Sequence, residues 1–485
     1  MKKLQKTESP MLAFDDLLRE AIRFLEMSEI CHKHHVKHTG KRAYLLDFYI
    51  CLGEVEKGKT FVEYLLSHIV ESKAGKIFYP GLMDPRNESS NAIDTGASVD
   101  AIARFLHVYR ESFTREEHVR YKKILGEVAE TYLKNAAAEK RITNQRLWGL
   151  TGLASYARYA DTNTYDDLIR ASVERAFSDM TEDGFFIYYP RAEDDGFCGY
   201  DGLTTHYQSR CTTFIRYSLE AAGIDVKSYE QRLQRSERAL LSMYCLDGTK
   251  DLRMECKRWY WLSTYEVASA GFDSYALAYS SVPEAKVALH NLLFQVRRHL
   301  NEGYLRSHIG APINYQCPIF WTAHLAWMLR VRDVKRYFDA ASSLKDFSFR
   351  FEGREVFTDT SPSHRALINA RWQRRNANEG IYENGLKDMV YWRFNVPALP
   401  STFLFSVHEL AVHTRDALRG WYIRECVLRL LRFAKELIVM LLPRYSVRYG
   451  KIESFTYNDN AIDVVVSPAT KYGTILHDTK INIRI

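Results

Sequence analysis

The sequence predicts a mainly α-helical protein, an (α/α)6 toroid of helical hairpins followed by a smaller β-rich domain. Three observations support this fold class. Residues 1–344 contain one amphipathic helical pattern after another. A similar unit recurs after roughly 50–60 residues, which is typical of repeat architectures. From residue 345 to 485, short runs of β-forming residues replace the helical pattern.

The helical part is expected to contain a leading helix near 11–27 and then six helix pairs with short internal turns such as "ADTNTY". The pairs are 43–53 with 59–74, 97–111 with 115–138, 143–160 with 164–180, 205–222 with 228–245, 265–281 with 283–301, and 317–331 with 332–343. Short extended pieces are expected after second helices, in "KIFYPG", "TEDGFFIYYP", "CLDGTKDLRM" and "NEGYLRSHIG". Six such hairpins close most simply into a ring with the first helices inside, and an open helical solenoid is the alternative.

The C-terminal part alternates β-forming residues with turn signals. The runs are "FSFRFEGREVFTD", "DMVYWRFNV", "STFLFSVHELAVHT" and "AIDVVVSPATKYGTILHDTKINIRI". One helix, at about 415–441, interrupts them. It is basic and strongly apolar, so we expect it to pack on the toroid, with peripheral contact to a membrane surface as the alternative.

The composition is typical of a globular protein, with 46% hydrophobic and 26% charged residues in 485. A net charge of +7 weakly favours an acidic partner. No basic tail or basic-aromatic motif indicates nucleic acid as that partner. Neither an apolar leader nor a run of about 18 apolar residues is visible, so we expect a cytoplasmic protein without a transmembrane segment. The eight cysteines include no C-x-x-C pair and are interpreted as reduced thiols.

Polar and aromatic residues gather where the first helices of the predicted ring begin. All these helices would start at one rim, where free N–H groups favour an anionic ligand. The candidate substrate-binding residues are Asp94, Gln145, Arg146, Trp148, Trp259, Trp261, Tyr265, Asn314, Tyr315 and Trp321. Structural interpretations stay open for several residues at this rim: Asp94 and Asn144 as helix caps, Trp148 as a core residue, His206 as a structural histidine and Tyr207 as a packed aromatic. Aromatic rings, amides and guanidinium groups together predict a site for a sugar that carries carboxylates.

Two segments point to a family. "TNQRLWG" holds Asn144, and "YDGLTTHYQSR" holds His206 and Tyr207 about one hairpin repeat later. With the predicted architecture, this resembles the uronate-cleaving polysaccharide lyases, notably the heparinase II/III-like group and its alginate- and hyaluronate-lyase relatives. These enzymes have an Asn at the start of one inner helix and a "DG" turn with a Tyr or His near the next. A further His or Arg often comes from the β domain or a later loop, and "SPSHRALINARWQRRN" offers His364 and Arg365.

The resemblance implies β-elimination on an acidic oligosaccharide or polysaccharide, with no metal and no cofactor. Asn144, with Gln145 or Arg210, would bind the uronate carboxylate and stabilise the enolate-like intermediate. Tyr207 or His206 would take the C5 proton, and Tyr207 would return one to the leaving oxygen. The residues implied as catalytic are Asn144, His206, Tyr207, Arg210 and His364.

Other functions stay open. A uronate C5-epimerase shares the proton removal, and a non-catalytic glycan-binding or scaffold subunit needs none of this chemistry. A glycoside hydrolase needs two carboxylates across the scissile bond. The carboxylates available for it are Asp94, Asp201, Glu266, Asp273 and those at 193–195. The histidine-rich stretch "CHKHHVKH" at 31–38 has a spacing that suits zinc but no second ligand set, so a solvated basic loop is expected there.

Overall fold

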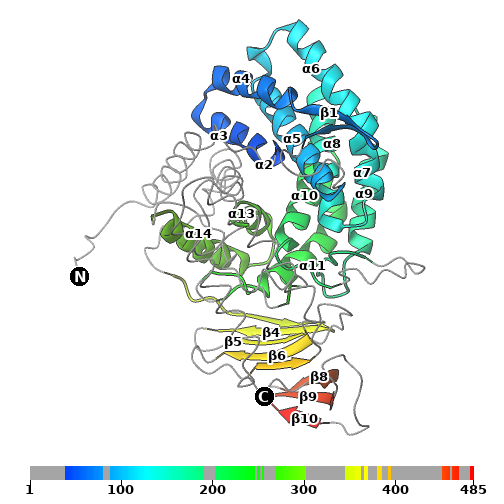
Figure 1. The fold of residues 1–485 in the computed structure, drawn as a ribbon. Helices are drawn as coiled ribbons and strands as arrows, with labels where there is room; N and C mark the ends of the chain where they lie inside the picture. Colours follow the sequence, from blue (N-terminus) through cyan, green and yellow to red (C-terminus); the bar gives the residue numbers. More distant parts are fainter. Residues whose placement is uncertain are drawn as a thin grey trace, which may run out of the picture.

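The computed structural model describes residues 39–79, 88–190, 202–245, 248–251, 254–255, 269–301, 344–361, 365–369, 379–384, 391–394, 450–458, 461–468 and 481–484. They form a mainly helical region followed by two antiparallel sheets (Figure 1). The predicted helices at 11–27, 317–343 and 415–441 lie outside the described residues. Among the helices that are described, none is both long and apolar enough to span a membrane.

The described helices form hairpins in which a first helix is followed by a second. The first helices are α2 (Thr39–Ala43) with α3 (Leu45–Leu52), α5 (Glu88–Val108), α8 (Thr143–Ala160), α10 (Gln208–Ala221) and α13 (Ala270–Tyr279). The second helices are α4 (Val55–Leu66), α6 (Arg115–Val128) continued through the π-helical segment η2 (Ala129–Leu133) into α7 (Lys134–Glu139), α9 (Asp166–Ser178), α11 (Glu230–Leu241) and α14 (Ala285–Asn301). Short 3-10 turns, η1 (Arg110–Ser112) and η3 (Val226–Tyr229), connect the two helices of two hairpins.

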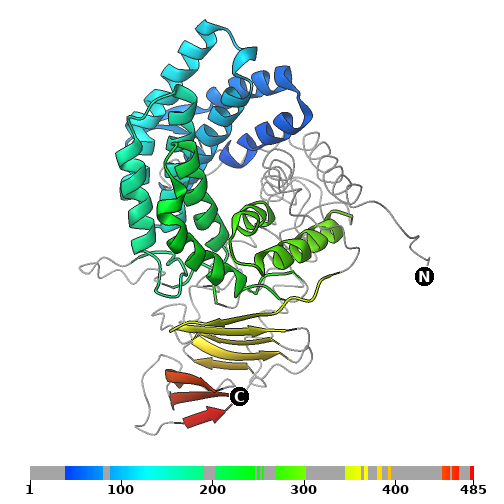
Figure 2. The ribbon, with the colours of Figure 1, turned by 180° about the vertical axis from the view of Figure 1, so that it is seen from behind.

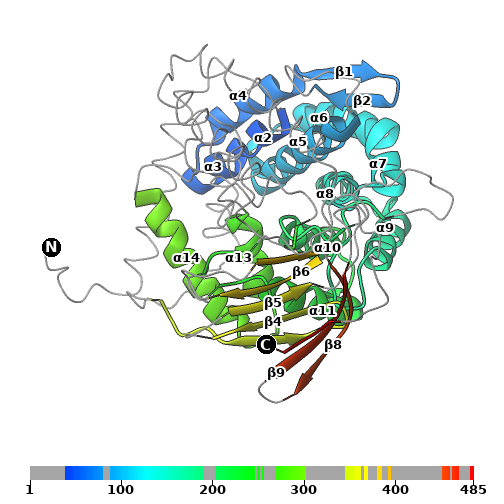
Figure 3. The same cartoon turned by 60° about the horizontal axis from the view of Figure 1, so that its bottom comes forward.

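The first helices lie inside an arc and the second helices outside it, as the view along the helices shows (Figure 3). Residues of α8 and α10 are buried on nearly every side, whereas α6 buries one face only. This difference follows from the layers, because an inner helix has neighbours all round and an outer helix faces solvent. The arc runs from α3 to α14, and the described residues do not close it into a ring.

The first helices run parallel, because contacts advance along neighbouring helices together. Gly96 of α5 lies against the backbone of Trp148 in α8, and further along both helices Ser155 of α8 donates a 2.6 Å hydrogen bond to Asp100 of α5. Between α8 and α10, Trp148 packs on Phe214 with ring centroids 4.5 Å apart. The first helices therefore begin on the same face of the arc, as the hairpin pattern predicts.

Three second helices are followed by a turn that contains a glycine with positive φ. These glycines are Gly75 (φ 119°), in the hairpin of β1 (Ile69–Ser72) and β2 (Gly75–Phe78), Gly184 (92°) and Gly248 (81°). Each lies against the backbone of the next second helix. A Cβ there would come within 2.2, 2.4 and 2.3 Å of backbone atoms of Thr131, Arg235 and Asn291. Only glycine fits such positions, and the turns confirm three of the four predicted extended pieces; the fourth lies outside the described residues.

Two predicted helix boundaries are wrong. The second helix expected at 59–74 ends at Leu66, because residues 69–78 pair as the β1–β2 hairpin. The helix expected from residue 97 starts at Glu88, so the polar stretch before 97 lies within α5. Its polar side chains are satisfied by tertiary contacts: Thr95 Oγ1, for example, accepts a 3.1 Å hydrogen bond from the Phe78 N–H.

The C-terminal strands form two sheets. The larger is an antiparallel meander of β3 (Phe349–Glu352), β4 (Val356–Thr360), β5 (Arg365–Asn369), β6 (Glu379–Asn384) and β7 (Tyr391–Phe394). The smaller has the order β10-β9-β8, from β8 (Gly450–Asn458), β9 (Ala461–Pro468) and β10 (Ile481–Arg484). The run "STFLFSVHELAVHT" lies outside the described residues.

The larger sheet packs against the face of the arc on which the first helices begin (Figures 1 and 2). Asp183, in the loop after α9, accepts hydrogen bonds from the N–H groups of residues 354, 355 and 356 at 2.6, 2.8 and 3.1 Å. Phe185 of the same loop contacts Phe351 of β3 edge-on. Asn291 of α14 pairs with both backbone groups of Lys345. The loops at the helix starts therefore lie between the arc and the sheet.

Candidate functional site

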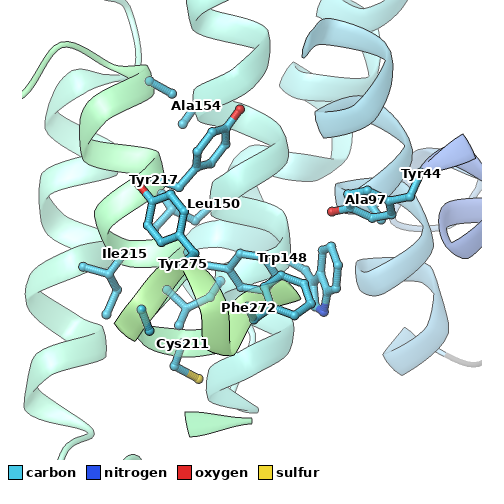
Figure 4. Packing of buried hydrophobic residues seen from close by; sticks show 14 of the residues in the cluster. Tyr44, Ala97, Trp148, Leu150, Ala154, Cys211, Ile215, Tyr217, Phe272 and Tyr275 are labelled. Atoms are coloured by element: carbon cyan, nitrogen blue, oxygen red, sulfur yellow. The ribbon is translucent and has the colours of Figure 1, made fainter. Parts of the chain in front are cut away.

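The inner face of α8, α10 and α13 carries an aromatic cluster one turn inside the helix starts. Trp148, Phe214 and Phe272 pack with ring centroids 4.5, 5.2 and 6.2 Å apart. Figure 4 shows Trp148 and Phe272 side by side in this cluster. Trp148 is only 2% exposed. Its assignment as a substrate-binding residue is therefore corrected: the indole belongs to the core, since neighbouring helices cover it on all sides.

A buried charged network lies deeper, beyond this aromatic cluster. Arg104 pairs with Asp47 at 2.9 Å and with Asp100 at 3.2 Å, and Tyr44 and Ser155 donate hydrogen bonds to Asp100. Burial raises the pKa of the Asp100 carboxyl, and the Arg104 guanidinium opposes that rise. Sequence reasoning did not single out these residues, which join α3, α5 and α8.

The starts of α8 and α10 are joined by a short piece of extended chain. The Thr143 N–H and hydroxyl donate to the carbonyls of Tyr188 and Ile187 at 3.2 and 2.8 Å. Ile187 pairs with Leu203, just before α10. The ring of Tyr188 stacks on Tyr207, with centroids 6.1 Å apart. The two sequence segments that contain Asn144 and Tyr207 are thus brought together.

Asn144 is the second residue of α8 and is 2% exposed. Its Oδ1 accepts no hydrogen bond from any described residue. No side chain caps α8, so the interpretation of Asn144 as a cap is wrong. It lies four residues before Trp148, on the same face of the helix. A buried amide oxygen without a partner is costly, which makes Asn144 available to a bound polar group. Gln145, beside it, is also buried.

His206, Tyr207 and Arg210 form one group at the start of α10. The imidazole of His206 lies edge-on to Tyr207 with centroids 4.9 Å apart, and the Arg210 guanidinium lies 4.9 Å from the centre of the Tyr207 ring. Arg210 Nη2 is 3.5 Å from His206 Nε2. His206 and Arg210 are buried and Tyr207 is partly exposed. An imidazole, a phenol and a guanidinium thus lie within contact distance of one another.

Two residues that were not among the predicted site residues hold this group in place. Glu255 accepts a 2.7 Å hydrogen bond from the His206 N–H. Gln208 accepts one from the Phe186 N–H and donates to the Gly184 carbonyl. Neither residue has a spacing signal, because both bind partners about 20 to 50 residues away.

Lys250 and Asp273 form an ion pair of 3.0 Å beside this group, and both side chains are fully buried. Burial lowers the pKa of the Lys250 ammonium, and the Asp273 carboxylate acts against that change. Asp273 was a candidate carboxylate for hydrolysis. In the structure it is engaged by Lys250, which removes it from the residues free to act on a glycosidic bond.

Two further predicted ligand contacts are engaged by the protein itself. Asp94 is fully buried within α5, where Oδ1 accepts a 2.9 Å hydrogen bond from the Gly40 N–H. It therefore neither caps α5 nor faces a ligand. Arg146 is fully buried toward the outer layer, paired with Asp179 and donating to the Lys140 carbonyl at 2.8 Å. Both were expected at the rim, but their polar atoms stabilise contacts between neighbouring segments.

Several predicted residues lie outside the described part of the chain. These are Trp259, Trp261, Tyr265, Asn314, Tyr315, Trp321 and His364, with Asp201, Glu266, the carboxylates at 193–195 and the histidine-rich stretch at 31–38. No protein-family model matches the chain, and no curated protein matches it. The chemistry of the described site is therefore the basis on which its function is argued.

Proposed function

We propose that this protein cleaves uronate-containing glycans by β-elimination, with its site at the starts of α8 and α10. The observation that supports this most strongly is the grouping of Asn144 with His206, Tyr207 and Arg210 through the Thr143–Tyr188 hydrogen bond and the Tyr188–Tyr207 stack. The first residue supplies a buried amide, and the other three supply groups that take up protons or stabilise negative charge.

The four residues have different roles in the reaction. The Asn144 Nδ2–H group donates a hydrogen bond to the uronate carboxylate, which stabilises the charge that develops when the C5 proton leaves. His206 or Tyr207 accepts that proton, and Tyr207 protonates the leaving glycosidic oxygen. Arg210, in contact with both rings, stabilises negative charge as it develops on the phenol.

The finer fold assignment is part of the same proposal. We propose that residues 317–343 supply a sixth hairpin that closes the arc into an (α/α)6 toroid. The parallel first helices and the repeated glycine turns support this, since both follow from a single repeating unit. An experimental structure that places 317–343 between α14 and α3 would agree with it, and a different position would contradict it.

The test of the activity is ultraviolet absorbance of the unsaturated uronate that elimination produces. Wild type, Tyr207→Phe and Tyr109→Phe are incubated with a panel of uronate-containing glycans. Tyr109 is the matched control, because its hydroxyl donates to the Ile50 carbonyl at the far ends of α5 and α3. We expect wild type and Tyr109→Phe to produce absorbance, and Tyr207→Phe to be at least ~100-fold slower.

The other outcomes separate the alternatives. No absorbance with any glycan, but uptake of deuterium at C5 in deuterated water, would mean epimerisation instead of cleavage. Neither signal, with no new reducing ends, would contradict enzymatic action at this site. Equal rates for Tyr207→Phe and wild type would remove Tyr207 from the chemistry.

A further inference from the structure

Glu255 is fully buried beside the start of α10, where an ionised carboxylate needs hydrogen-bond partners. Its Oε2 accepts a 2.7 Å hydrogen bond from the His206 N–H and a 3.4 Å one from the Thr205 hydroxyl. Tyr207, the residue that precedes α10, makes no side-chain capping bond. A carboxylate from a distant segment therefore accepts the backbone N–H of the residue just before Tyr207, close to the positive end of the α10 dipole.

The charges around His206 make this carboxylate more than a cap. Arg210, from the same helix, approaches the far side of the imidazole at 3.5 Å. Ser269, just before α13, contacts both the Arg210 guanidinium and the His206 carbonyl. Lys250 is a second buried cation, which interacts electrostatically with Arg210 and Glu255. Asp273 is its ion-pair partner. Glu255 thus places a negative charge at the His206 backbone, while Arg210 places a positive charge beside the His206 imidazole.

We propose that Glu255 is a positioning residue for His206. It holds the His206 backbone in place and, through its negative charge, keeps the imidazole able to accept a proton beside Arg210. The naming of His206 as a proton acceptor rests on the proposed function, but its placement and its electrostatic coupling to Glu255 do not. The coupling can therefore be measured with no substrate present.

The first experiment follows the His206 imidazole by NMR in the full-length protein with labelled histidine, assigned by the signal lost in His206→Gln. Glu255→Gln keeps a hydrogen-bond acceptor of similar shape and removes the charge. We expect the midpoint of the His206 titration to move to lower pH by about one unit, a tenfold change in proton affinity, because the negative charge that stabilises the protonated imidazole is then lost.

The control is Asp225→Asn, which makes the same chemical change at another cap. Asp225 accepts the Lys227 N–H at 3.0 Å, beyond the far end of α10. This variant should leave the His206 titration unmoved. A His206 midpoint that is the same in Glu255→Gln and wild type would overturn the proposal, because a cap with a purely structural role would behave in that way.

Wild type supplies a second measurement if Glu255→Gln does not fold. The His206 amide resonance should shift on acidification as the carboxylate that accepts its hydrogen bond is protonated. An amide that does not respond while the protein stays folded would overturn the proposal.

Activity gives an independent readout if the wild type performs elimination. Glu255→Gln should lower kcat by about 10- to 100-fold with little change in KM, and the acid limb of its pH profile should move to lower pH. Asp225→Asn should match wild type in both. A wild type without elimination activity would refute the proposed function, yet the NMR titration would still decide the role of Glu255.

Discussion

Gln208 offers the sharpest test of how the start of α10 is held. Its side chain is fully buried. The carbonyl oxygen accepts the Phe186 N–H at 3.0 Å, and the amide nitrogen donates to the Gly184 carbonyl at 2.8 Å and to Ser236 at 3.0 and 3.2 Å. The perturbation is Gln208→Leu, which keeps a similar volume and removes every one of these hydrogen bonds.

The magnitude follows from the groups left behind. Phe186 is fully buried, so its N–H loses its partner where water does not replace it. The Gly184 carbonyl loses its bond to the same side chain, whereas the Ser236 hydroxyl keeps a 2.6 Å contact with Thr212. Each buried group left unsatisfied costs about 1–3 kcal/mol. We therefore expect the free energy of unfolding to fall by about 2–5 kcal/mol.

The assay is urea unfolding of wild type, Gln208→Leu and the control Gln234→Leu. Gln234 lies on α11 and makes one exposed hydrogen bond, to Ser281 at 3.0 Å. The control should lie within about 0.5 kcal/mol of wild type. A loss below about 1 kcal/mol in Gln208→Leu, or equal losses in the two variants, would refute the view that Gln208 anchors α10.

Two further predictions concern the sheet contact and the response to acid. Asp183→Asn places an NH2 group where two backbone N–H groups now donate to a carboxylate oxygen. Urea unfolding should therefore show that the free energy of unfolding falls by about 1–3 kcal/mol. An unchanged free energy of unfolding would mean that the turn at 354–356 does not depend on Asp183. The pKa of Glu63 is lowered chiefly by the hydrogen bond from Arg120 and further by the one from Tyr121. Ionised Glu63 therefore stabilises the fold above the pKa it has in the unfolded chain, and this stabilisation is lost as the pH falls through its pKa in the folded protein. Between about pH 5 and pH 3, the Tm of Glu63→Gln should thus fall less than that of wild type. The difference should be equivalent to less than about 1 kcal/mol, because the ion pair of Glu63 with Arg120 is partly exposed. An equal fall of Tm in both proteins would contradict a contribution of Glu63 to the acid response.

Much of the helical framework was predictable from local pattern. The helix expected at 143–160 is α8 with the same bounds, and the one expected at 115–138 matches α6 to α7 closely. Helix starts and periodicity are properties of a few adjacent residues, which explains this agreement. The same local pattern predicted short extended pieces after second helices, and Gly184 and Gly248 lie within two of these pieces.

Predictions from local sequence pattern were wrong where the hydrogen-bond partner of a polar residue lies far away along the chain. The start of α5 was placed too late because the hydrogen bonds of Asp94 and Thr95 come from Gly40 and Phe78. Trp148 was expected to contact a ligand, and only the neighbouring helices show that it is enclosed.

The sequence by itself determined where α8 and α10 begin, to within a few residues, and so that Asn144, His206, Tyr207 and Arg210 stand at helix starts. The tertiary structure decided which of the rim residues are engaged by the protein and which are free for chemistry. It paired Arg146 with Asp179 and brought Glu255 to His206 across 49 residues. The physical reason is that hydrogen bonds and ion pairs act over a few ångströms in space, whereas sequence patterns report only on neighbours along the chain.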